Sequence, residues 1–449
     1  MKTVVAMLSL CVLALAAHAC AGTPEDQAIA NTLMKQIVNL THQELSEMAP
    51  NQPGFVPSHR DHSKDFASCY MLAFLYKTPS LLNPYYGKAS TRDKAIAIAD
   101  WIARTNARPE WPLYLLAQTY GLLKADIPPE TTKAWRAYVE NYVATRGIEP
   151  FFYTSPNHEA WNAMAIYRAG QVFGEKRWMT VGARLMHELM KMQTPLGYFD
   201  EGPGHGPSMK YNNLQIAAML LYADFSGDQQ VLADSKKLFD FMVRYSYPDG
   251  SPIAALDGRK DYSFGYFGTL CYGIDRWPLG KELDLRIYGT RKKWGILNVN
   301  SPHYDFSNWY ADVGGRLLVD EYRSWRPNAP AAPLPQDKDG YRAVGNSCTF
   351  RGGVVRQHGW MVALSAINSD VPRYSHSIFQ LERQSRIGIW NVKTGLIIGG
   401  GSNMVGTKMP LANFELLTGF RGVTSDFGTL GGGRELDRQA VYFPRALKA

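Results

Sequence analysis

The stretch RPNAPAAPLPQDKD, residues 326–339, divides the chain into two parts with different residue patterns. Four of its fourteen residues are proline. Proline lacks a backbone N–H and fixes φ, so it cannot continue a helix, and at this density it forms a semi-rigid connector. We therefore expect a linker at 326–339 between one domain over 22–325 and a second over 340–449.

Before the linker, apolar residues recur at helical spacing in one segment after another. The first segment begins at Pro24, and Ile29, Leu33 and Ile37 share one of its faces. Similar segments follow at 63–77, 91–105, 110–124, 130–145, 157–173, 178–193, 210–225, 229–245 and 305–323. Short loops between helices of this length favour antiparallel hairpins, and no repeat of fixed length is visible. This pattern predicts an incomplete (α/α) toroid rather than a regular solenoid.

After the linker, the apolar pattern changes to a period of two, which is typical of strands. We expect strands at 353–356, 359–364, 387–392 and 396–398, with a turn at 393–395. The predicted fold class is therefore α+β and multidomain. A toroid of helical hairpins comes first, and an antiparallel β-sheet domain, most simply a sandwich, follows it.

Residues 1–21 have the pattern of a secretory signal peptide. Lys2 precedes a nearly unbroken apolar run at 4–17, and two overlapping small-x-small cleavage sites lie at 17–21. The run is too short to span a membrane, and no later segment has about 18 consecutive apolar residues. We expect an exported protein, periplasmic or secreted, with no transmembrane span. Lipid attachment at Cys20 is an alternative, although His18 makes a poor lipoprotein box.

The composition excludes several classes of protein. Of the 449 residues, 45% are hydrophobic, 20% charged and 12% aromatic, which excludes disordered, collagen-like and coiled-coil chains. Cysteines are few and show no CxxC spacing, so neither a disulfide framework nor a zinc site is indicated. The net charge of +8 is not gathered into a basic arm. For an exported chain, this surplus fits a carboxylated or sulfated glycan better than nucleic acid.

The stretch FFYTSPNHEAWN, residues 151–162, is the first candidate for chemistry. Pro156 suits the first turn of a helix. Asn157 and His158 would then lie at the helix N-terminus, where free backbone N–H groups and the helix dipole stabilise a bound carboxylate. Trp161 follows His158 by three residues and flanks the same spot. The alternative is that Asn157 only caps the helix and His158 is an ordinary surface residue.

The stretch GYFDEGPGHGPSMKYNN, residues 197–213, is the second candidate. It is a glycine- and proline-rich loop between two helices. It carries Asp200, Glu201, His205, Lys210 and Tyr211. Catalytic groups concentrate in loops that a rigid scaffold supports. The alternative is a purely structural loop, in which Tyr211 packs into the next helix.

These two stretches together resemble the toroid polysaccharide lyases, which include the heparinase II/III-like enzymes and the helical-toroid alginate lyases. In those families an Asn-His pair begins one inner helix, as Asn157 and His158 do here. A Tyr follows later, after a segment of the type Asp-Gly-x-x-x-Glu…Ser-Pro-x-Tyr. Here the corresponding letters are DEG at 200–202 and PSMKY at 207–211. The order of a helical toroid and then a β-domain also matches, over most of the chain.

The resemblance implies cleavage of a uronate polymer by β-elimination. It gives Asn157 the role of neutralising the substrate carboxylate, and His158 and Tyr211 the roles of base and acid, in an order that the sequence does not assign. The expected substrate-binding residues are Tyr153, Trp161, His205, Lys210 and Arg259. The alternative for Arg259 is a turn residue that pairs with a neighbouring Asp. His303, Tyr374 and His376 are further candidates, although each is more simply structural.

Other functions stay open at this point. One is a toroid glycoside hydrolase in which Asp200 or Glu201 is the acid, and another is a glycan-binding protein without catalysis. No cofactor is required by the expected chemistry. No set of metal ligands is indicated, because solvent exposure or helix capping accounts for HRDH at 59–62. The sequence does not reveal whether a divalent metal ion has a structural role. The sequence does not choose among alginate, glucuronan, glycosaminoglycan and ulvan, between endo and exo cleavage, or among oligomeric states.

Overall fold

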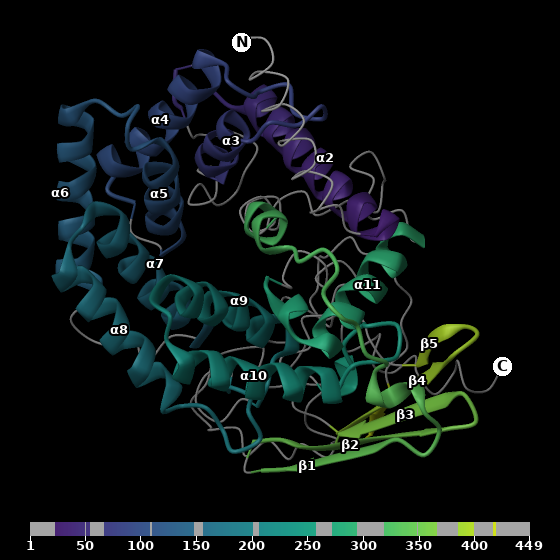
Figure 1. The fold of residues 1–449 in the computed structure, drawn as a ribbon. Coiled ribbons are helices and arrows are strands. Elements are labelled where there is room, and N and C mark those ends of the chain that lie inside the picture. Colours follow the sequence, from purple (N-terminus) through teal and green to yellow (C-terminus); the bar gives the residue numbers. More distant parts are fainter. Residues whose placement is uncertain are drawn as a thin grey trace, which may run out of the picture.

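The computed structural model describes residues 23–49, 51–53, 67–107, 110–147, 156–200, 206–256, 272–293, 318–347, 349–365, 385–398 and 416–418. Within these ranges the helices follow one another around a ring, and the strands lie at one side of it (Figure 1). The predicted toroid of helical hairpins followed by an antiparallel sheet is confirmed.

The helices of the ring fall into an inner and an outer set (Figure 1). The inner helices are α3 (Ala67–Lys77), α5 (Glu110–Leu123), α7 (Pro156–Phe173) and α9 (Met209–Ser226). The outer helices are α4 (Ala89–Arg104), α6 (Pro129–Arg146), α8 (Lys176–Met190) and α10 (Gln229–Arg244). Residues 67–75 of α3 are all buried, whereas α8 buries one stripe that includes Trp178, Leu185 and Leu189. A helix that is apolar on all sides lies inside a fold, and an amphipathic helix covers it.

The two ends of the helical region meet and close the ring. Here α2 (Pro24–Glu47) lies against α11 (Pro278–Lys293), and α3 lies against a helical segment at 318–324. Lys281 Nζ is 2.7 Å from Asp26 Oδ1, and both side chains are buried. The Tyr70 hydroxyl donates to Asp320 Oδ1 at 2.7 Å. The sequence did not indicate α11, because charged residues, Lys281 among them, interrupt its apolar stripe and are themselves buried.

The described strands form one antiparallel sheet in the order β1-β2-β3-β4-β5, with β6 also paired to β4. The strands are β1 (Arg342–Asn346), β2 (Arg351–Gln357), β3 (Trp360–Ser365), β4 (Ser385–Asn391), β5 (Gly395–Ile398) and β6 (Leu416–Thr418). The four predicted strands correspond to β2 through β5. The face with Met361 and Trp390 is buried, and the face with Val344 and Leu364 is exposed. The described residues provide no second sheet for a sandwich.

The sheet is fixed to the ring by aromatic packing and by the linker. The Phe350 ring lies 5.4 Å from the ring of Phe241 and 5.1 Å from that of Tyr245, between centroids. In the linker, Gln336 Nε2 donates to Ser246 Oγ at 2.9 Å beside the 3-10 turn η4 (Pro335–Asp337). The proline-rich stretch is therefore held against the helices along part of its length.

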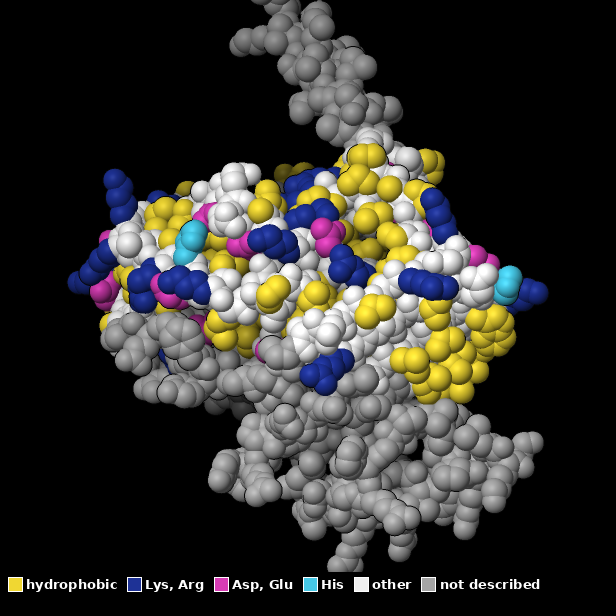
Figure 2. Space-filling view, turned by 90° about the horizontal axis from the view of Figure 1, so that it is seen from below, with side chains coloured by type: hydrophobic (Ala, Val, Ile, Leu, Met, Phe, Trp, Pro, Cys, Tyr) yellow, Lys and Arg dark blue, Asp and Glu magenta, His cyan; other side chains and the backbone are white. Residues whose placement is uncertain are grey.

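Two surface properties bear on possible partners. Lys and Arg side chains are spread over the side of the molecule seen in Figure 2 rather than gathered into one patch. Among the helices that the structure describes, none combines the length and the apolar character that crossing a bilayer requires.

Candidate active site

The inner helices α7 and α9 run parallel, and their first turns lie side by side. Three contacts follow one another along both helices. The Trp161 indole N–H donates to the Leu214 carbonyl at 3.0 Å, the rings of Tyr167 and Tyr222 are 5.0 Å apart, and Gln171 Nε2 donates to the Phe225 carbonyl at 3.0 Å. The offset between partners stays between 53 and 55 residues. The same offset places the first turn of α7 level with the first turn of α9.

Helix α5 runs alongside α7 in the same direction. The Trp111 ring, in its first turn, lies 6.2 Å from the His158 ring, and Arg168 Nε donates to Gln118 Oε1 at 2.9 Å further along. The N-termini of α5, α7 and α9 therefore share one end of the ring. Because free backbone N–H groups and positive dipole ends meet there, this end favours an anionic ligand.

Asn157 stands at this end as a buried amide with an unused acceptor. Only 1% of the side chain is exposed, and its Oδ1 has no hydrogen-bond partner in the described part of the chain. Buried polar atoms are nearly always hydrogen-bonded, so an unsatisfied one calls for an explanation, and a bound ligand or a water molecule would supply the missing partner. Rotation of the amide exchanges its oxygen and its NH2 group, so Asn157 is able to accept or to donate at this position.

His158 and the tryptophans beside it occupy the same end. His158 is exposed to solvent, whereas Trp161 is completely buried, 4.5 Å from the half-buried Trp111 between ring centroids. Trp161 packs in the core and uses its N–H on Leu214, so its ring offers no face to a sugar, contrary to the expectation from sequence. Trp111 holds the position at the rim that the sequence analysis gave to Trp161. Nothing in the local sequence around Trp111 distinguishes it from a core residue.

Tyr211 comes from the first turn of α9 and is 5% exposed. It is level with Asn157 and His158 through the register of α7 and α9. Asn212 holds the preceding loop in place, because its Oδ1 accepts from the Phe199 N–H at 2.9 Å and its Nδ2 donates to the carbonyls of Phe199 and Ser208 at 3.0 and 2.9 Å. The register of α7 and α9 therefore puts the first turns that carry Asn157, His158 and Tyr211 at the same end of the ring.

Asp200 lies at the base of the same loop, where it forms a β-bridge with Pro207. It is half-buried. Ser208, the N-cap residue of α9, is fully buried, and its hydroxyl has no hydrogen-bond partner among the described residues. Asp200 and Ser208 thus flank the bridge at Pro207, just before the first turn of α9.

A buried polar cluster lies one turn deeper in the ring. The Asp320 carboxylate accepts hydrogen bonds from the hydroxyls of Tyr70 and Tyr114, each at 2.7 Å, and Arg323 donates to the Tyr70 hydroxyl at 2.9 Å. Burial, and next the Asp320 charge, raise the pKa of Tyr70 and that of Tyr114. These two tyrosines therefore stay protonated donors. The Tyr114 ring packs 5.3 Å from that of Trp161, which links the cluster to the site above it.

Several expected site residues lie outside the residues that the structure describes. These are Tyr153, Glu201, His205, Arg259, His303, Tyr374 and His376, together with the side chain of Lys210. Residues 1–22, with the signal-peptide pattern and Cys20, are outside them too. In the described ranges, no three His, Cys, Asp or Glu residues are grouped closely enough to hold a metal ion.

Comparison with known proteins gives similarity in structure only. No protein family and no curated protein matches the sequence. A Paenibacillus xanthan lyase is similar with a TM-score of 0.47 and 12% identity, over 82% of this chain and 38% of that one. A chondroitin AC lyase of Streptomyces coelicolor A3 has a TM-score of 0.45 and 13% identity, over 77% and 50%. An unsaturated glucuronyl hydrolase of Bacillus sp. GL1 has a TM-score of 0.45 and 12% identity, over 66% of this chain and 94% of that one. The chain thus spans half or less of the two lyases, and the likeness concerns the helical toroid fold at low identity.

Proposed function

We propose that this chain is an exported polysaccharide lyase that cleaves an anionic, uronate-containing glycan by β-elimination. One observation carries the proposal: the buried Asn157 amide, with an unused acceptor, stands at the N-terminus of α7 beside the exposed His158 and level with Tyr211. Its support is this geometry together with the residue pattern. The export part of the proposal rests on the signal-peptide pattern of residues 1–21.

The reaction explains why an amide is needed at a helix N-terminus. The proton on C5 of a uronate is weakly acidic, because the neighbouring carboxylate already carries a negative charge. As that proton leaves, negative charge builds up on the carboxylate oxygens. The Asn157 NH2 group and the N-terminal dipole of α7 would stabilise this charge more in the transition state than in the ground state. One such donor is typically worth ~10²–10³ in rate.

Two further groups complete the elimination. A base removes the C5 proton, the electron pair forms the C4–C5 double bond, and the C4–O bond to the leaving sugar breaks. An acid then protonates the departing oxygen. His158 and Tyr211 fill these two roles, each typically worth ~10²–10⁴ in rate. The base ends the reaction with one extra proton and the acid with one fewer, and the exposure of His158 lets it exchange with solvent so that both starting protonation states are restored.

Asp200 supports a second candidate function, hydrolysis. Asp200 lies at the base of the loop before α9, and a protonated carboxyl group there would donate a proton to a glycosidic oxygen. Hydrolysis adds water across the bond and forms no double bond. The products therefore separate the two reactions.

The test is to incubate the full chain with alginate, glucuronan and glycosaminoglycans and to measure two signals. One is the ultraviolet absorbance of the 4,5-unsaturated uronate, and the other is the number of new reducing ends. The lyase proposal expects both signals to rise together on one of these polymers. Reducing ends without the absorbance would show hydrolysis and overturn it. Binding without either signal would indicate a glycan-binding protein.

A further inference from the structure

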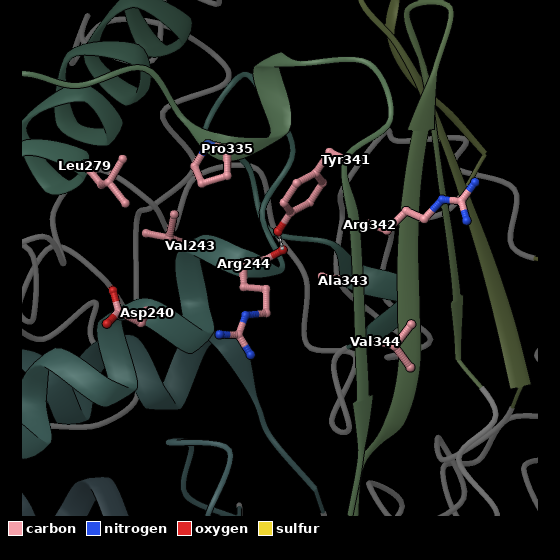
Figure 3. A pocket seen from close by; sticks show the side chains of 9 residues that line it. All are labelled: Asp240, Val243, Arg244, Leu279, Pro335, Tyr341, Arg342, Ala343 and Val344. Atoms are coloured by element: carbon pink, nitrogen blue, oxygen red, sulfur yellow. Dashed lines mark hydrogen bonds between the residues drawn. The ribbon is translucent and has the colours of Figure 1, made fainter.

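A groove of about 520 Å³ lies where the helical ring meets the sheet (Figure 3). Arg244 and Asp240 of α10 line one side, Leu279 of α11 and Pro335 of the linker line the next, and Tyr341 leads into β1 opposite. Its volume is in the range of small-molecule sites, and such sites occur preferentially between domains. None of the residues that line the groove belongs to α7 or α9, so it is separate from the first turns of those helices.

The charges in the groove are unequal. The Asp240 carboxylate is already paired with Lys236, 2.5 Å away on the same helix. Arg244 is exposed, and in the part of the chain that the structure describes no carboxylate pairs with it. Its guanidinium points into the space between α10 and β1, whereas that of Arg342 extends away over the sheet (Figure 3). The groove therefore offers one planar cation that lacks an anion.

The walls of the groove are held in place without a ligand. The Tyr341 hydroxyl donates to the Arg244 carbonyl at 2.9 Å, which fixes the ring against the backbone of α10 at the end of the groove (Figure 3). Beneath the linker, the Arg286 guanidinium donates to Asp337 Oδ1 and Oδ2 at 2.6 and 2.7 Å. A site that is already formed loses little conformational freedom when a ligand binds.

We propose that this groove is an accessory site for an acidic sugar unit of the glycan. The guanidinium of Arg244 binds the carboxylate, a geometry that suits its planar donors. The sugar ring lies against Tyr341, Pro335 and Leu279, and Asp240 accepts from a sugar hydroxyl. The choice of a uronate as the ligand rests on the proposed function. The existence of the groove and of its Arg244 guanidinium does not depend on that function.

The direct test is a calorimetric or NMR titration of the full chain with glucuronate, glucose and inorganic phosphate. To separate the groove from the candidate active site, the Asn157→Ala variant is titrated as well. We expect glucuronate to bind more tightly than the two other probes, and to bind the Asn157→Ala variant undiminished at the groove. Arg244→Gln should weaken glucuronate binding by about tenfold, as expected for the loss of a charge-assisted bidentate contact. Arg342→Gln, the matched control, should change it less than about twofold.

Three results would overturn the accessory site. They are equal binding of glucose and glucuronate, equal loss from Arg244→Gln and Arg342→Gln, and phosphate that binds as tightly as glucuronate. Circular dichroism checks that both variants fold. If no polymer is cleaved but the titration shows the Arg244 dependence, the lyase proposal fails and the groove stands. Cleavage that needs Asn157, without glucuronate binding that depends on Arg244, would leave the lyase proposal in place and remove the groove.

Discussion

The hydroxyl of Tyr198 lies 2.7 Å from the Oγ of Ser347, in the turn between β1 and β2, although 149 residues separate them. It is also 2.5 Å from Thr349 Oγ1. The next residue, Phe199, is held by Asn212 of α9 through its own N–H and carbonyl. The sheet thus reaches the loop that carries Asp200 through a buried tyrosine. One role of the sheet domain is therefore to fix this side of the candidate site.

Tyr198→Phe tests this coupling, because it keeps the buried ring and removes the hydroxyl. We expect the free energy of unfolding to fall by about 1–2 kcal/mol, since the hydroxyls of Ser347 and Thr349 each lose one hydrogen bond, although Ser347 keeps its bonds to Phe350. Amide hydrogen exchange at Phe199 should become faster. Tyr341→Phe is the control, because the bond that the described residues give its hydroxyl is to the carbonyl of Arg244, so exchange at Phe199 should stay unchanged. Unchanged exchange at Phe199 in Tyr198→Phe would show that the sheet does not support the loop.

Asn157 and Asn212 are both buried, but we expect substitution of the first to reduce activity and substitution of the second to reduce stability. Within the described part of the chain the Asn157 amide oxygen makes no hydrogen bond, so Asn157→Ala should change the free energy of unfolding by less than about 1 kcal/mol, while kcat should fall by ~10²–10³. Asn212→Ala removes three hydrogen bonds to the loop and should lose about 2–4 kcal/mol of stability. Urea unfolding and the ultraviolet elimination assay measure the two quantities. Loss of stability without loss of turnover in Asn157→Ala would contradict the assigned role.

Trp111 and Trp161 lie in contact and should respond differently to truncation. Trp161 is completely buried, so Trp161→Ala should cost about 3–5 kcal/mol of stability. The half-buried Trp111 stands beside His158, and Trp111→Ala should mainly raise KM, by about tenfold for a sugar contact of ~1.4 kcal/mol. Steady-state kinetics and urea unfolding separate the effects. A KM that Trp111→Ala leaves unchanged would exclude this ring from the substrate site.

Local patterns made the helices and central strands predictable, because each depends on residues close together in the chain. The stripe of Leu185 and Leu189 in α8 is such a pattern. The pairing of Tyr70 with Asp320 joins residues 250 positions apart, and no local feature indicates it. In the candidate site, the helix-start pattern singled out Asn157, and the resemblance to a family gave Asn157 and Tyr211 their expected roles. No local signal indicates the half-buried position of Trp111 beside His158, because burial depends on the neighbouring helices.

Alkaline pH should unfold the protein through its buried tyrosines. Burial is the main cause that raises the pKa of Tyr222 to about 12 and that of Tyr341 to about 12. In the unfolded chain both titrate near 10. The folded state then binds more protons above about pH 10, so this stabilisation is complete below that pH and is lost as the pH rises towards 12. Circular dichroism and phenolate absorbance should change together. Ionisation of most tyrosines near pH 10 with an unchanged fold would contradict this expected alkaline unfolding.

Gly182 lets α8 approach α7, the helix that begins with the candidate catalytic pair. A Cβ atom on Gly182 would lie 2.6 Å from the Tyr167 backbone N and 2.7 Å from the Ala163 carbonyl O, so one helix must move to admit it. We expect Gly182→Ala to lower the free energy of unfolding by about 1–3 kcal/mol, as overpacking does. Gly289→Ala in α11 is the matched control, because nothing lies within 4 Å of its Cβ position. Since alanine favours helix over glycine by about 1 kcal/mol, that variant should be as stable as the parent or more stable. Urea midpoints measure both, and equal stability of the two variants would show that close packing at Gly182 does not hold α7 in place.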